Sequence, residues 1–395
     1  MGAYFNSFTP MYMGRGAALE IGTLISERGG HSVLLIHDRN LPAALVGPVA
    51  AAVREAGLKC TVFSDLEAEV PDYCVHRALE ALRAAGDVDF LLALGGGSSM
   101  DCTKALNILV NNPGPLSRYY IRNGGKAENP GLPIIAIPTT SGSGSEFMAA
   151  AVVCDSENGG QKCPLASPVC CATALAVIDP CLMTSVPKDY TAITGVDVIG
   201  HCYEGYTGNT ALWSPMLDQI ALDGISLAVK YLPQAMKDLS NVDYREKLAL
   251  ASSFGGLSSE MGRGHMGHGF AHALGSTVHA PHGVCVAAAM PFVMEFITPA
   301  RMEKNREVLR IFGGDCPEDA SPAELGAALR EAVLAFFGEV GMPTLDQYGG
   351  TRDKVMDAAK YAVKDVALRR IKGAEMDEEI VNRILTKICE TYHLD

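Results

Sequence analysis

Half of the histidines in this chain lie in one short stretch. Five of the ten fall between residues 264 and 283, within the sequence GHMGHGFAHALGSTVHAPHG. A sixth, His201, follows Asp197 by four positions in the segment TGVDVIGHCYEGY. Imidazole and carboxylate side chains together are typical ligands of a borderline divalent metal such as Zn²⁺ or Fe²⁺. The sequence therefore points first to a metal site.

The spacing of these residues indicates two helices that each carry a pair of polar side chains on one face. Asp197 and His201 are four residues apart, so both side chains share a face of a predicted helix. His268 and His272 repeat this spacing on a second predicted helix, and His282 follows them. One such pair is often solvated or structural, but two pairs and a further histidine favour metal binding. Spacing alone does not separate His272 from a metal ligand.

The other histidines and the cysteines are interpreted as structural. His265 and His279 exceed what a metal site needs, so we expect them to be structural or to line the rim of a pocket. The twelve cysteines are scattered and form no CxxC pair, as expected of small buried side chains in a reducing compartment. Cys202 and Cys285 flank the histidines. A ligand role for them is the less favoured alternative, because enough histidine and aspartate is present.

The first half of the sequence predicts a nucleotide-binding site. An apolar strand at 88–94 runs into Gly95-Gly96-Gly97-Ser98 and then into a helix. Glycines let the backbone approach an anion, and the free amides at a helix start attract phosphate. A second loop of Thr, Ser and Gly, at 138–146, follows another strand. Two such loops favour a ligand crevice over the alternative, which is a tight strand-to-helix turn.

Asp38 ends the first of these predicted strands and is a candidate ribose ligand. A carboxylate at this place accepts hydrogen bonds from the ribose hydroxyls of an adenosine and repels a 2′-phosphate, which favours NAD over NADP. The usual fingerprint places the acid after the glycines, whereas Asp38 precedes them. On spacing alone, an ordinary turn aspartate before Arg39 and Asn40 stays open as the alternative.

The chain divides into an α/β half and a helical half. Apolar strand candidates recur between residues 31 and 140 with helices between them, which predicts a parallel sheet with helices on both faces. Beyond Pro187 the sequence shows helical periodicity and few strand candidates. We therefore predict a dinucleotide-binding α/β domain at 1–187 and an all-helical, metal-binding domain at 188–395.

Composition argues against several classes of partner. The net charge of −13 disfavours binding to nucleic acid. No unbroken run of apolar residues is long enough to predict a membrane span. The N-terminal sequence MGAYFNSFTPMYMGRG lacks the basic start and apolar segment of a signal peptide. We therefore expect a cytoplasmic protein.

A nucleotide crevice and a metal site together predict hydride chemistry. A metal can polarise an alcohol oxygen while the neighbouring carbon passes a hydride to a nicotinamide. Apolar residues such as Phe270 and Leu274 lie among the histidines and suit such a site.

These motifs together resemble the iron-containing (group III) alcohol dehydrogenase family, in particular its lactaldehyde/propanediol reductase-like and butanol dehydrogenase-like members. The resemblance covers nearly the whole chain. The matching segments, in the order and spacing of the family, are GGGSSMDCTKA, IPTTSGSGSE, AVIDP, TGVDVIGHCYEGY and HGFAHALGSTVHAPHG.

The resemblance implies a fold, an activity and two cofactors. The implied fold is a Rossmann-like N-terminal domain and a helical C-terminal domain, with the active site in the cleft between them. The implied reaction transfers a hydride between NAD(H) and a small primary alcohol or diol, or its aldehyde. The metal is expected to be Fe²⁺, with Zn²⁺ possible, and the protein is expected to form a homodimer or larger homo-oligomer.

The resemblance also assigns roles to individual residues. The four metal ligands of the family fall on Asp197, His201, His268 and His282. The next family histidine falls on His272 and lies near substrate and nicotinamide rather than on the metal; its role as proton relay or as substrate positioner stays open. The cofactor contacts fall on Asp38 for the ribose, on Gly96, Gly97, Ser98 and nearby Asp101 for the diphosphate loop, and on Thr139, Thr140, Ser143 and Lys162.

Some positions depart from the family pattern. Val70 stands where many members have an asparagine near the nucleotide, and Thr173 stands where a proline is usual. Val278, His279 and Ala280 replace an aromatic residue and an asparagine, so the wall of the substrate pocket is expected to differ.

Two other functions stay open. A lyase similar to dehydroquinate synthase uses NAD and metal on the same scaffold, but it needs several basic residues and the histidine stretch offers only Arg263. A non-catalytic nucleotide- or metal-binding protein is the second alternative. Loss of a ligand position would favour it, and all four positions are filled.

Overall fold

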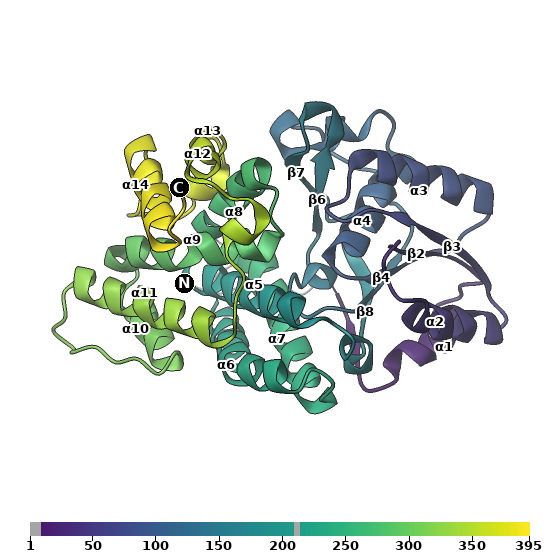
Figure 1. Ribbon diagram of the computed structural model, residues 1–395. Helices are drawn as coiled ribbons and strands as arrows, with labels where there is room; N and C mark the ends of the chain where they lie inside the picture. The colour runs from purple at the N-terminus through teal and green to yellow at the C-terminus, as the bar shows by residue number, and fades with distance from the viewer. Residues whose placement is uncertain (1–8, 209–213) are drawn as a thin grey trace. The chain divides into compact units, whose positions relative to one another are not determined.

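The computed structural model describes residues 9–208 and 214–395, so the first half of the N-terminal sequence on which the signal-peptide expectation rests lies outside the described part. The chain forms two compact units (Figure 1). One unit contains the described residues up to Thr140 together with Gly144–Ser185. The other contains Val186–Asp395 and the short segment Ser141–Ser143.

The first unit is built on a six-stranded parallel sheet, as the sequence predicted. The strand order is β1-β8-β5-β4-β2-β3, and every pair of neighbours is parallel. The central strands are continuous apolar runs because both of their faces are covered. Their bounds are Met11–Met13 (β1), Ser32–Asp38 (β2), Lys59–Leu66 (β3), Phe90–Gly95 (β4), Ile134–Pro138 (β5) and Thr173–Ile178 (β8).

Helices cover both faces of this sheet, and the side chains of β2 show how. Leu34 and Ile36 belong to one apolar cluster with α3 and α4, whereas Leu35 belongs to another cluster with α1 and α2. Alternate residues of a strand point to opposite faces, so the two clusters are the two cores of a three-layer unit. The helices are Ile21–Ser26 (α1), Ala43–Glu55 (α2), Asp72–Ala85 (α3) and Gly97–Asn111 (α4).

A small antiparallel hairpin accompanies the main sheet, and the sequence analysis did not predict it. Strand β6 (Ala150–Asp155) pairs with β7 (Gln161–Ala166). Its apolar side chains alternate with partly exposed ones, and Val153 and Leu165 join the core of the first unit. The short length of both strands and the Gly159-Gly160 turn hid this element among loop residues.

The second unit is helical, as predicted. Helix α5 (Lys188–Thr207) is buried along most of its length and packs against α6, α7 and α9. Helices α5 and α7 approach each other closely at Gly205 and Gly262. An added Cβ at Gly262 would lie 2.5 Å from the Cα of Gly205. The other main helices are Pro215–Lys237 (α6), Val242–Gly262 (α7), Met266–Val278 (α8), His282–Ile297 (α9), Met302–Ile311 (α10), Pro322–Glu339 (α11), Arg352–Asp357 (α12), Ala359–Ala362 (α13) and Glu378–Thr391 (α14).

Helix α9 is more apolar than the sequence analysis recognised. The segment His282–Ala300 is long and apolar enough to cross a membrane, with a mean hydropathy of 1.6. However, 78% of it is buried inside the structure, where it packs against α5, α8, α11 and α14. Its composition is therefore that of a core helix.

Candidate active site

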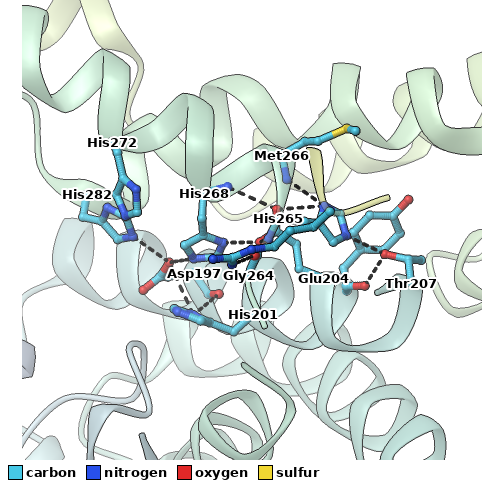
Figure 2. Close-up of polar contacts among 12 residues, drawn as sticks. Asp197, His201, Glu204, Thr207, Gly264, His265, Met266, His268, His272 and His282 are labelled. Atoms are coloured by element: carbon cyan, nitrogen blue, oxygen red, sulfur yellow. Dashed lines mark hydrogen bonds and ion pairs between the residues drawn. The ribbon is translucent and has the colours of Figure 1, made fainter. Parts of the chain in front are cut away.

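Three helices of the second unit bring the predicted metal ligands together. Asp197 and His201 lie one turn apart on α5, His268 lies on α8, and His282 is the first residue of α9. Figure 2 shows the imidazoles of His268 and His282 directed at the carboxylate of Asp197, with His201 beneath it. The ligand atoms of Asp197, His201 and His268 all lie within 4.8 Å of one another.

Oxygen Oδ1 of Asp197 is the point on which these groups converge. It lies 3.7 Å from Nε2 of His268 and 3.9 Å from Nε2 of His282. Ligand atoms that share one ion at about 2.1 Å lie no more than about 4.2 Å apart, so both distances suit a common ion. His201 turns Nδ1 towards the backbone carbonyl of Asp197 at 3.0 Å, which leaves its Nε2 for a ligand.

Two buried atoms of this cluster have no hydrogen-bond partner among the described residues. They are Oδ1 of Asp197 and Nε2 of His268. The distance between them is too long for a hydrogen bond. Leaving such atoms unsatisfied in a buried site is costly, and a divalent cation would satisfy both. The donor set of one carboxylate and three imidazoles therefore fits a metal such as Fe²⁺ or Zn²⁺.

The carboxylate of Asp197 is ionised in this setting. Burial alone would raise the pKa of Asp197, but the imidazoles of His201, His268 and His282 hold it well below its usual range. The negative charge is thus retained inside the unit at any ordinary pH. It is available to bind a cation without first losing a proton.

A fully buried glutamate behind the cluster was not identified from the sequence. Glu204 accepts a hydrogen bond from Nδ1 of His268 at 2.7 Å and one from the backbone N–H of His265 at 2.6 Å. Burial alone would lower the pKa of His268, but the carboxylates of Glu204 and Asp197 raise it to about 10. By holding Nδ1–H, Glu204 directs Nε2 of His268 towards Asp197. Its position seven residues after Asp197, on the same helix face, was a readable signal.

The two surplus histidines occupy separate places. His265 is fully buried, and its Nδ1 accepts from the backbone N–H of Met266 while its Nε2 lies 2.9 Å from Oγ1 of Thr207. Burial lowers the pKa of His265 to about 4, so the ring is neutral. His279 is exposed and ends α8 in the left-handed conformation.

His272 lies beside the cluster on α8. Its ring stacks against that of His282, with centroids 5.7 Å apart (Figure 2). Its Nδ1 lies 3.3 Å from Oδ2 of Asp365, a residue that the sequence analysis did not single out. Partial burial opposes ionisation of Asp365, but the hydrogen bond from His272 lowers its pKa. His272 and Asp365 are far apart in the sequence, and no pattern in it predicted their pairing.

In the first unit, the strand ends that lead into the two predicted phosphate loops lie side by side. Strands β4 and β5 are neighbours in the sheet, and the backbone N–H of Thr139 donates to the carbonyl of Gly95 at 2.9 Å. Gly95 has a φ of +145°, and α4 begins immediately after Gly96. A Cβ at Gly96 would lie only 3.1 Å from Oγ1 of Thr140. The bare backbone at the start of α4 therefore offers the close approach that a phosphate needs.

The side chain of Asp101 is already used within the fold. Its carboxylate accepts hydrogen bonds from Oγ of Ser145 at 2.8 Å and from the backbone N–H of Val152 at 2.9 Å. The buried Nζ of Lys104 also contacts Oγ of Ser145, at 2.7 Å, and donates to the carbonyl of Met148 at 2.8 Å. Asp101 and Lys104 thus fix the position of Ser145, at the end of the second predicted phosphate loop.

The other predicted cofactor residues lie on different elements. Asp38 lies at the end of β2, next to β4, and accepts from the backbone N–H of Asn40 at 2.7 Å. Oγ of Ser98 accepts from the backbone N–H of Glu69 at 3.3 Å, and the carboxylate of Glu69 pairs with Lys162. Gly97 opens α4, whereas Ser143 belongs to the second unit.

Sequence models of one protein family match almost the whole chain. The model described as iron-containing alcohol dehydrogenase matches residues 9–180. The model of the C-terminal part of the Fe-containing alcohol dehydrogenase family matches residues 191–389. The chain belongs to the iron-containing alcohol dehydrogenase family. Its predicted fold class, family and dehydrogenase type are thereby confirmed.

Individual relatives of this alcohol dehydrogenase extend over both units. The chain is 31% identical to the NAD-dependent methanol dehydrogenase of Bacillus methanolicus, over 91% of this chain and 94% of the relative. It is 30% identical to the lactaldehyde reductase of Escherichia coli strain K12, over 90% and 91% of the two chains. A crystal structure of 1,3-propanediol oxidoreductase is 27% identical and superposes with a TM-score of 0.89, over 98% of this chain and all of the other.

We expect Glu204→Gln to weaken metal binding without unfolding the protein. An amide has one acceptor oxygen, and its NH₂ group would face an N–H donor of His265 or His268. Loss of such a supporting partner typically lowers metal affinity about 10- to 100-fold. Competition with a chromophoric chelator measures the affinity. Glu331→Gln, on the exposed surface of α11, is the matched control. Equal affinities in the two variants would rule out the supporting role of Glu204.

Proposed function

We propose that the protein is an NAD(H)- and metal-dependent alcohol dehydrogenase, or aldehyde reductase, that acts on small primary alcohols or diols. The observation that carries this proposal is the buried Oδ1 of Asp197, which faces three imidazoles without a hydrogen-bond partner among the described residues, in a member of this family. In the direction of reduction, one aldehyde, one NADH and one proton give one alcohol and one NAD⁺.

The proposed metal ligands are Asp197, His201, His268 and His282. Their mixture of one oxygen and three nitrogens accepts Fe²⁺, with Zn²⁺ as the second choice. When bound, the metal polarises the substrate oxygen and the nicotinamide carries the hydride. The protein holds the ligands in place before the ion arrives, through Glu204 behind His268 and the carbonyl of Asp197 behind His201.

The proposed NAD site lies at the edge of the parallel sheet where β2, β4 and β5 end. The backbone of Gly96, Gly97 and Ser98 would hold the diphosphate, and Asp38 would accept from the ribose. Further contacts are proposed for Thr139, Thr140, Ser143 and Lys162. Asp101 contributes by shaping the loop of Ser145, since its oxygens already accept two hydrogen bonds. On this basis residues 1–187 form the dinucleotide-binding domain and 188–395 the metal-binding domain.

His272 is the proposed catalytic residue. Its ring lies next to that of His282, and its side chain is 25% exposed, so part of the imidazole is accessible to solvent. Nδ1 is turned towards Asp365. Nε2 has no hydrogen-bond partner in the described part of the chain, and it is the atom that can accept or return the substrate's hydroxyl proton.

The proposed setting is the cytoplasm, with small molecules as substrates and no nucleic-acid or membrane partner. All twelve cysteines are free, which suits a reducing compartment. The acidic net charge of −13 opposes binding to nucleic acid. Assembly into a homodimer or larger homo-oligomer is proposed from the family resemblance.

An absorbance assay with NADH and short aldehydes tests the proposed function against the lyase. We expect the metal-loaded protein to oxidise one NADH for each aldehyde reduced, with small unbranched aldehydes or hydroxyaldehydes preferred. A lyase that uses NAD transiently would show no net change in NADH. The lyase has little support here, although the structure adds one basic group near Arg263: the guanidinium of Arg370 donates to the carbonyl of Gly264.

Asp38→Gly tests the ribose assignment. Removal of the carboxylate should lower the preference for NAD over NADP, expressed as the ratio of kcat/KM values, by at least about 10-fold, or about 1.4 kcal/mol. The reason is that a 2′-phosphate no longer meets a negative charge. Asp38→Asn keeps an acceptor for Asn40 and removes only the charge, so it should shift the ratio in the same direction. An unchanged ratio in both variants excludes Asp38 from the ribose site.

A further inference from the structure

The contact between His272 and Asp365 constrains which ring nitrogen of His272 carries a hydrogen. Nδ1 of His272 lies 3.3 Å from Oδ2 of Asp365. An ionised carboxylate can only accept a hydrogen bond, so the ring nitrogen must be the donor. In the neutral imidazole the second nitrogen, Nε2, then carries no hydrogen and is an acceptor.

Asp365 is itself held in place by two independent contacts. Its Oδ1 accepts from the backbone N–H of Ala367 at 2.8 Å, at the start of a short 3-10 helix (Val366–Arg369). This helix packs against α8 at Gly269, where an added Cβ would lie 2.3 Å from Cδ1 of Leu368. Gly269 is one turn before His272 on the same helix. The carboxylate is therefore fixed relative to the imidazole, and Oδ2 is the oxygen left for His272.

Arg370 is the other charged group near Asp365. It interacts electrostatically with Asp365, while its Nη1 donates to the carbonyl of Gly264. Among the described residues the guanidinium forms no ion pair with Asp365. His272 is thus the only imidazole among the described residues that hydrogen-bonds to this carboxylate.

We propose that Asp365 is a positioning residue for His272: it fixes the Nδ1–H tautomer and orients the ring so that Nε2 is presented as the acceptor. The inference rests on the proposed function, in which His272 faces the substrate. Asp365 acts only through His272 and touches neither substrate nor metal. In the oxidation of an alcohol, the acceptor nitrogen is what the departing hydroxyl proton requires.

Asp365→Asn separates this role from a purely structural one. The N–H of Ala367 still requires an oxygen, so the amide oxygen takes the place of Oδ1 and the amide NH₂ takes the place of Oδ2. The NH₂ group then donates to Nδ1 of His272, and the hydrogen of the ring moves to Nε2. Asparagine is as good a helix cap as aspartate, so the fold is preserved. The variant therefore changes the tautomer of His272 and removes one negative charge, while the cap of the short helix is kept.

The direct readout is the protonation state of the two ring nitrogens. Long-range proton–nitrogen correlation spectra of the zinc-loaded protein report it, and His272→Ala identifies the signal. We expect hydrogen on Nδ1 in the wild type and on Nε2 in Asp365→Asn. Hydrogen on Nε2 of His272 in the wild type overturns the inference. This readout needs no turnover, so it stands apart from the test of the dehydrogenase activity.

The kinetic readout is a double-mutant cycle in the NADH assay. Asp365→Asn should lower kcat about 10- to 100-fold, with little change in the KM for the aldehyde or in bound metal. In a His272→Ala background the same change should alter kcat less than about 2-fold. A full additional loss in that background, or an effect on KM alone, contradicts the inference.

Two further variants complete the experiment. Asp377→Asn is the matched control, because Asp377 caps α14 through the N–H of Ile380 at 2.8 Å and has no histidine partner; its kcat should be unchanged. If Asp365→Asn does not fold, Asp365→Ser keeps a capping oxygen and is too short to reach His272. It should show the same loss of kcat, and wild-type kcat in Asp365→Ser overturns the proposal.

Discussion

A carboxylate can be buried at low cost only where positive charge or hydrogen-bond donors face it. Asp197 is 6% exposed, and one of its oxygens has three imidazoles around it but no hydrogen bond from a described residue. The local structure therefore leaves Oδ1 of Asp197 and Nε2 of His268 available to bind a cation. Much of the helical unit can be understood as the support that this arrangement needs, because without a cation the buried Oδ1 of Asp197 has no hydrogen-bond donor among the described residues.

The support begins with close helix packing. Helix α5 carries Asp197, and its approach to α7 at Gly205 and Gly262 leaves no room for a Cβ at either glycine. The same helix carries Glu204, whose hydrogen bonds fix both the start of α8 and the ring of His268. Helix α5 thus supplies two of the ligands, Asp197 and His201, and also the carboxylate that orients His268. In the other unit, one helix again supports a predicted site: Lys104 and Asp101 of α4 hold the loop around Ser145.

The sequence was sufficient to predict the parallel sheet, the helical half and the family, because apolar periodicity and motifs with fixed spacing are local signals. Pairs four residues apart indicated a metal site, but the set of Asp197, His201, His268 and His282 came from the family resemblance, because spacing alone did not separate His272 from a ligand. Glu204 could have been found by extending the same helix face by one turn. Asp365 could not, because its contact with His272 depends on how two distant segments pack at Gly269. The β6–β7 hairpin was missed for a different reason: its strands are short and their sequence shows no strong alternating pattern.

Metal content measured in the wild-type protein and in Asp197→Asn tests the central claim most directly. Asparagine keeps the shape and one oxygen but removes the charge that three imidazoles surround. Protein prepared without oxygen and supplied with Fe²⁺ or Zn²⁺ should bind one ion per chain, by elemental analysis, and Asp197→Asn should lose most of it while circular dichroism shows the same fold. A wild-type chain that binds no metal, or an Asp197→Asn chain with a full complement, would contradict the account.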